Sequence, residues 1–187
     1  MCCRRTVGSR SYFRGVEDHS VRSSSADFDF AFGDWVVRHR CLTKRLAGGG
    51  TGADAREDAG DWIEFGGTMS TRPILGGSGN LEDNVLSKPG DEYRAVALRS
   101  FDPADGTWAI WWLDGRAPHR LDVPVVGGFA DGIGTFFADD MLDGRAIRVR
   151  FVWTRQGADS LRWEQAFSTD GGQSWEVNWE MAFTRAV

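Results

Sequence analysis

His39 is the polar side chain whose type and position best fit chemistry inside this protein. In the segment GDWVVRHRCL, residues 33–42, it alternates with Trp35 and Val37. Because successive side chains of a strand point to opposite faces, these three share one face. Histidine changes charge near neutral pH, so His39 is a candidate general acid or base in an aromatic interior. The alternative is a histidine that only forms a hydrogen bond to a neighbouring strand.

Glu64 is the candidate partner of His39 in proton transfer. It lies two residues after Trp62 in the segment WIEFGG, so a strand here places both side chains on one face. We expect that face to line the interior, where burial raises the pKa of a carboxyl group and lets it act as an acid. Glu164 and Glu176 each adjoin a tryptophan and are expected on the opposite, solvated face.

Nine tryptophans supply more aromatic surface than a simple core requires, and many occupy alternating positions. This surplus indicates a cavity for a small molecule. Two amides, Gln165 and Asn178, suit either the orientation of a ligand or a bond to a neighbouring strand. The expected ligand-binding residues are Trp35, Val37, Trp62, Trp112, Trp153, Trp163, Gln165, Asn178 and Trp179.

The sequence lacks the usual patterns of metal-binding and phosphate-binding sites. The three histidines form neither a His-x-His nor a His-x3-His pair, so we expect no metal and no cofactor. The glycine-rich segment 75–80 lacks the Gly-Lys-Ser/Thr ending of a phosphate-binding loop. We interpret it as a mobile loop at a cavity entrance, to which Asn80, Glu82, Asp83 and Asn84 contribute.

The charge pattern narrows the class of partner. The net charge is −5, and the 22 lysines and arginines are scattered, which argues against nucleic acid and anionic membranes. No apolar run approaches the roughly 20 residues of a membrane-spanning helix. The start of the chain has no apolar signal core, and three cysteines suggest no disulfide framework, so we expect a cytoplasmic protein.

The chain organisation indicates one all-β domain. Residues 1–26 are rich in Arg and Ser without periodicity and are expected to form a disordered leader, followed by a domain at 27–187. Turn signals such as DPADGT at 102–107 recur between alternating segments and predict about eight to ten strands. Sequential hairpins with one apolar face must stack as two sheets or close into a barrel.

A resemblance favours the barrel. Gly33-x-Trp35 is similar to the opening motif of lipocalins and fatty-acid-binding proteins, the calycin group, where the tryptophan plugs one end. Longer segments, including FDFAFGDWVVRHRCL at 28–42, LRSFDPADGTWAIWW at 98–112 and WEQAFSTDGGQSWEVNWEMAFTR at 163–185, resemble the bacterial DUF1579-type lipocalin-like family, which has no settled activity. The resemblance implies a single antiparallel up-and-down β-barrel. Such barrels often bury an arginine that holds a ligand carboxylate, so Arg150 joins the expected ligand-binding residues.

The segment STDGGQSW, 168–175, matches the Asp-box of sialidase propeller blades. Sialidases carry several copies, whereas this chain has one copy and only two tyrosines. We therefore interpret it as a turn in the last hairpin, in which the aspartate accepts backbone N–H groups.

Three functional hypotheses remain at this point. The first is binding of a small apolar or aromatic molecule inside the barrel. The second is a barrel enzyme, such as a cyclase, isomerase or hydratase of bacterial secondary metabolism, that uses His39 and Glu64 in proton transfer. The third is a homodimeric interaction module without a ligand.

Overall fold

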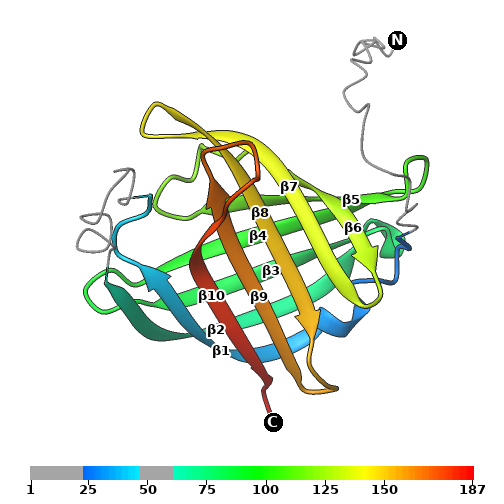
Figure 1. Cartoon of the computed structure of the whole chain (residues 1–187). Coiled ribbons are helices and arrows are strands. Elements are labelled where there is room, and N and C mark those ends of the chain that lie inside the picture. Colours follow the sequence, from blue (N-terminus) through cyan, green and yellow to red (C-terminus); the bar gives the residue numbers. More distant parts are fainter. Residues whose placement is uncertain (1–22, 47–60) are drawn as a thin grey trace, which may run out of the picture.

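A computed structural model describes residues 23–46 and 61–187, which form a β-barrel (Figure 1). The described residues contain ten strands and two short 3-10 helices, η1 (Asp29–Ala31) and η3 (Leu75–Gly77). The strands are β1 (Gly33–Leu42), β2 (Trp62–Ile74), β3 (Gly79–Ser87), β4 (Tyr93–Asp102), β5 (Thr107–Asp114), β6 (Val125–Ala130), β7 (Ile133–Leu142), β8 (Arg145–Arg155), β9 (Ser160–Ser168) and β10 (Glu176–Arg185).

Each strand pairs antiparallel with the next along the chain, and β1 also pairs with β10. Figure 1 shows β1 beside both β2 and β10, where the sheet closes on itself. Closure leaves none of these strands with a free edge. The predicted all-β, single antiparallel up-and-down barrel is confirmed, with ten strands.

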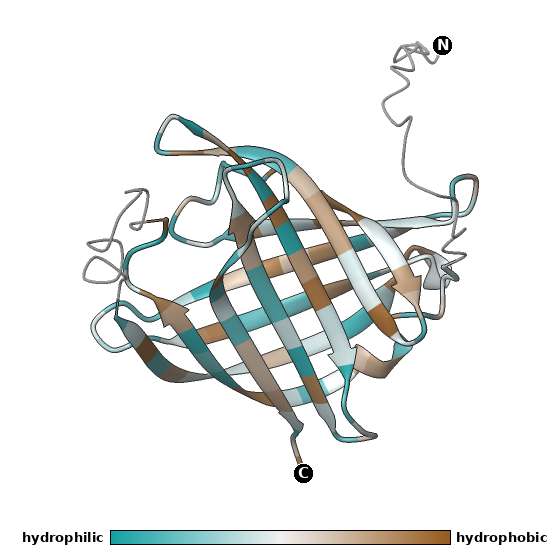
Figure 2. Cartoon of the chain, viewed as in Figure 1, coloured by the Kyte–Doolittle hydropathy of each residue, from teal (hydrophilic) through white to brown (hydrophobic). Residues whose placement is uncertain are grey.

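The alternation of side chains separates interior from exterior. In β1, Trp35, Val37 and His39 are buried, whereas the intervening Val36 and Arg38 are exposed. Figure 2 shows the same alternation as bands of hydrophilic and hydrophobic residues along the strands. The predicted interior face of β1 is therefore confirmed.

The segment before β1 closes one end of the barrel. Phe28 is fully buried and packs edge-on against Trp108 and Phe129. The indole Nε1 of Trp35 donates to the carbonyl of Ala31, and the Arg185 guanidinium lies 4.2 Å from the Trp35 ring. Ser23 and Ser24 also contact this end, since Ser23 Oγ accepts from the Phe129 backbone N–H and Ser24 O accepts from Trp108 Nε1. The rest of the predicted leader, 1–22, lies outside the described residues.

The mouth of the barrel is the opposite end, where loops 88–92, 115–124, 143–144 and 169–175 join the strands. Residues 47–60, between β1 and β2, lie outside the described residues. The interpretation of 75–80 as a loop at the cavity entrance is wrong. Gly76 and Gly77 make a tight turn with positive φ at the closed end, and strand β3 follows. Its inward residues Asn80, Glu82 and Asn84 are polar, which hides the usual hydrophobic alternation of a strand.

Within the part of the chain that the structure describes, no helix is long and apolar enough to cross a membrane.

Gly67 is a position where the barrel wall leaves no room for a side chain. A Cβ there would lie 2.4 Å from the carbonyl oxygen of Val85 and 2.8 Å from His39 Nε2. We expect Gly67→Ala to lower the free energy of unfolding by about 1–3 kcal/mol, because the backbone must shift. A Cβ at neighbouring Gly66 meets nothing within 4 Å, so Gly66→Ala should change stability by less than about 0.5 kcal/mol. Urea denaturation of both variants tests this, and equal stabilities would contradict it.

Candidate functional site

A cavity of about 400 Å³ occupies the barrel between its core and its mouth. Side chains from β3 to β10 form its wall, and residues of the mouth loops reach its upper part. The aromatic side chains of the wall are Trp112, Phe151, Trp153, Trp163, Phe167 and Trp179. The aliphatic residues Ile110, Val125, Ile147, Val149 and Met181 complete the apolar lining.

The indoles of the wall hold one another in edge-to-face contacts. Trp179 meets Trp163 at 5.7 Å and 85°, and meets Trp112 at 6.1 Å and 81°. Phe151 meets Trp163 at 4.8 Å and 74°. Such contacts favour fixed ring orientations, so the cavity presents a preformed aromatic surface.

His39 stands next to this wall without lining the cavity. It is 1% exposed, stacks on Phe65 at 4.7 Å, and its Nδ1 accepts a hydrogen bond from Trp179 Nε1 at 3.3 Å. Burial lowers the pKa of His39 to about 4, so the imidazole is neutral at pH 7. The structure thus shows the hydrogen bond to a neighbouring strand, and His39 meets the cavity only through the indole that it positions.

Glu64 and Trp62 lie on the outer face of β2, so the expectation that they face the lumen is wrong. The β1–β2 register sets Glu64 opposite Arg40 and Phe65 opposite His39. The inward positions of β2 therefore begin with Ile63 and Phe65 rather than with Trp62. Glu64 is exposed and forms an ion pair with Arg38, while the Arg40 guanidinium covers the Trp62 ring at 4.0 Å.

Arg150 also lies outside, and its expected place in the interior is wrong. It pairs with Glu164 at 3.2 Å, and its guanidinium lies 4.6 Å from the ring of Trp175. The apolar residues Val149, Phe151 and Trp153 of β8 take the inward positions. Glu164 is on the outer face, as expected.

The interior arginine is Arg99, which the sequence interpretation missed. It is 1% exposed, forms an ion pair with Glu82, and donates from Nη1 to Asn80 Oδ1 at 2.8 Å. Asn84 Nδ2 donates to the other oxygen of Glu82 at 3.0 Å. One signal was present in YRAVALRSF, because Arg99 shares its face with Ala95 and Ala97 while Arg94 does not.

The remaining expected ligand-binding residues divide into three groups. Trp112, Trp153, Trp163, Gln165 and Trp179 lie on the cavity wall. Trp35 and Val37 are inside the barrel but pack in its core near the closed end, away from the cavity. Asn178 is fully buried and accepts a 2.7 Å hydrogen bond from Gln165 Nε2, so it positions Gln165 against the cavity.

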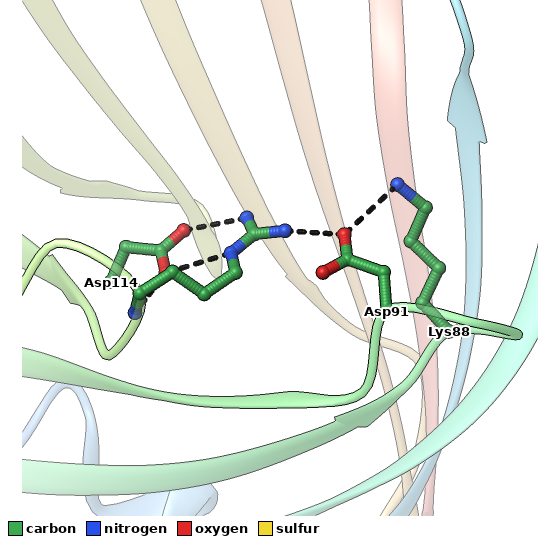
Figure 3. A network of polar contacts seen from close by, with 4 residues as sticks. Lys88, Asp91 and Asp114 are labelled. Atoms are coloured by element: carbon green, nitrogen blue, oxygen red, sulfur yellow. Dashed lines mark hydrogen bonds and ion pairs between the residues drawn. The ribbon is translucent and has the colours of Figure 1, made fainter.

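An ion-pair network crosses part of the mouth (Figure 3). Arg116 donates to both carboxylate oxygens of Asp114 and to Asp91, which also pairs with Lys88 at 3.4 Å. The Arg116 guanidinium lies 3.6 Å from the ring of Tyr93, and burial raises the pKa of Tyr93 to about 12. The network ties loop 88–92 to the turn after β5, and its Arg116 packs against Tyr93, which burial keeps neutral.

The Asp-box is a turn, as predicted. Asp170 accepts hydrogen bonds from the hydroxyls of Ser168 and Ser174 and from the Ser174 backbone N–H. These bonds, those from Ser174 first, hold the pKa of Asp170 well below its ordinary value. The indole of Trp175 donates to Gly172 O at 3.0 Å and lies over the hairpin, outside the cavity.

Across residues 23–46 and 61–187, no three His, Cys, Asp or Glu side chains gather closely enough to hold a metal ion. Comparison with known proteins gave no match to a protein-family model or to a curated protein. The functional argument therefore rests on the geometry of the cavity.

The low pKa of His39 predicts a pH-dependent stability. The histidine of the unfolded chain takes up a proton as the pH falls below about 6.5, whereas the buried His39 does so only near pH 4. As the pH is lowered from about 6.5 to about 4, the free energy of unfolding should therefore fall by about 1.4 kcal/mol per pH unit because of His39 alone.

His39→Gln should remove that part of the slope while keeping an acceptor for Trp179. His119→Gln, at an exposed loop position, is the matched control and should keep the slope. Urea denaturation from pH 7 to pH 4.5 measures it. Identical slopes for the wild type and His39→Gln would show that His39 is not held neutral by burial.

Proposed function

We propose that this protein binds a small apolar or aromatic molecule inside the barrel. The observation that carries the proposal is the cavity of about 400 Å³ with four indoles in its wall, Trp112, Trp153, Trp163 and Trp179. Ligand pockets usually have volumes of about 300–1,000 Å³ and apolar walls with a few polar groups. Here Gln165, Arg99 and Glu82 lie among aromatic and aliphatic side chains, while charged residues of the mouth line the upper part, among them Arg45, Arg116, Arg120 and Asp122.

We further infer a lipocalin-like barrel. The closed end supports this inference, because Trp35 there is fixed between the Ala31 carbonyl and the Arg185 guanidinium, two residues after Gly33. Gly33 has a φ of 101°, a conformation that favours glycine, and it starts the first strand. The antiparallel closure of β1 on β10 agrees with the same family of folds.

The alternative of proton transfer by His39 and Glu64 lacks a shared site. The two side chains lie on opposite faces of the barrel wall, one buried behind Trp179 and the other exposed beside Arg38. A general acid and base must both reach the substrate within hydrogen-bond distance. Binding without this pair is the function that the geometry supports.

Titration with N-phenyl-1-naphthylamine, an uncharged probe that fluoresces in apolar sites, tests the proposal. We expect saturable binding of one molecule per chain. Ala138 lines the cavity, so Ala138→Trp should fill part of it and weaken binding at least tenfold. Ala182 is exposed on the outer face of β10, and Ala182→Trp is the control that should leave the affinity unchanged. Circular dichroism confirms that both variants fold.

Absence of saturable binding to the wild type would contradict the proposal. Equal affinity of the wild type and Ala138→Trp would also contradict it, because the probe would then occupy another surface.

A further inference from the structure

Four residues, which we call the floor, form a cluster at the inner end of the cavity: Asn80, Glu82, Arg99 and Trp153. The side-chain acceptors of this cluster are already hydrogen-bonded. Arg99 donates to one carboxylate oxygen of Glu82 and to Asn80 Oδ1, and Asn84 donates to the second oxygen of Glu82. Each strong side-chain acceptor of the floor therefore already has a donor.

Some hydrogen-bond donors of the floor have no partner in the described part of the chain. Arg99 Nε, Trp153 Nε1 and Asn80 Nδ2 are buried and have no hydrogen-bond partner among the described residues. A buried donor without a partner is costly, and most native structures avoid one. Three such donors in one cluster point to an acceptor that arrives from outside the chain.

Two of the residues that carry these donors, Arg99 and Trp153, line the cavity. Both residues are at least 97% buried, since their exposed fractions are 1% and 3%, and both line the cavity. The Arg99 guanidinium carbon lies 4.9 Å from the centre of the Trp153 ring. An oxygen atom that enters at this end of the cavity therefore meets two residues that each carry an unpaired donor.

The charge of the floor indicates which chemical class of ligand acceptor it can bind. Arg99 is its cation, and Glu82 already neutralises it in a buried ion pair. A ligand carboxylate would add a second anion to this pair, and burying an unbalanced charge costs several kcal/mol. A carbonyl oxygen accepts hydrogen bonds without adding charge.

We propose that the cavity floor recognises an uncharged carbonyl oxygen, as in an aryl ketone or aldehyde, through Arg99 Nε and Trp153 Nε1. This inference rests on the proposed function and adds the chemical class of the ligand. The aromatic part of the ligand then lies against Trp163 and Trp179, nearer the mouth.

Three probes of matched shape test the inference by isothermal titration calorimetry at pH 7: 2-acetylnaphthalene, 2-ethylnaphthalene and 2-naphthoate. We expect the ketone to bind the wild type at least tenfold more tightly than the hydrocarbon, and the carboxylate to bind most weakly. Comparison on the wild type needs no variant to fold.

Trp153→Phe keeps an aromatic ring and removes one donor, so it should reduce the ketone-to-hydrocarbon preference at least fivefold. Trp111 lies on the outer side of β5, away from the cavity, and Trp111→Phe should keep the preference.

The outcomes separate the two proposals. Equal or tighter binding of the hydrocarbon overturns the carbonyl inference and leaves the proposed function standing. Tightest binding of the carboxylate overturns the claim of an uncharged ligand. An unchanged preference in Trp153→Phe overturns the role of its indole N–H. Failure of all three probes to bind counts against the proposed function itself, and the inference falls with it.

Discussion

The pairing of β1 with β10 is the constraint on which the rest of the structure depends. It closes the sheet, and closure commits one side of every strand to the interior. On β1 this places Trp35, Val37 and His39 inside. A shift of the register by one residue would place Arg38 and Arg40 inside instead. The cavity and its polar floor both follow from this fixed alternation.

Side chains fill the barrel interior tightly near the closed end and loosely nearer the mouth. The looser packing leaves the cavity that forms the candidate site. Near the closed end, Phe28, Trp35 and Trp108 are about 1% exposed or less and pack as an ordinary core. Nearer the mouth the indoles surround a cavity of about 400 Å³. The buried ion pair Arg99–Glu82 lies between the two regions. The pair need not stabilise the fold, because the cost of removing both charges from water opposes their attraction. The role in ligand recognition that we propose accounts for its place beside the cavity.

Local alternation in the sequence predicts an all-β domain and much of the cavity wall, whereas the choice of a barrel over two stacked sheets comes from the resemblance to lipocalin-like proteins. Trp112, Trp153, Trp163 and Trp179 were assigned inward on that basis, and the structure places them on the wall. Trp62, Glu64 and Arg150 were assigned inward wrongly. Trp62 and Glu64 share one face, as predicted, but only pairing with β1 decides that this face is the outer one.

The polar floor was hidden for a related reason. Polar side chains at alternating positions suggest an exposed strand or a loop, so Asn80, Glu82 and Asn84 looked like entrance residues. Their partner Arg99 comes from the next strand, and no local pattern links it to them. The role of His39 depends likewise on Trp179, which is 140 positions away in the sequence.

Two-dimensional NMR of the indole N–H groups tests the central claim most directly, since each of the nine tryptophans gives one signal. On saturation with 2-acetylnaphthalene, we expect the signals of Trp112, Trp153, Trp163 and Trp179 to shift, whereas those of Trp62, Trp111 and Trp175, outside the cavity, stay in place. Shifts confined to those three outer tryptophans would contradict a binding site inside the barrel.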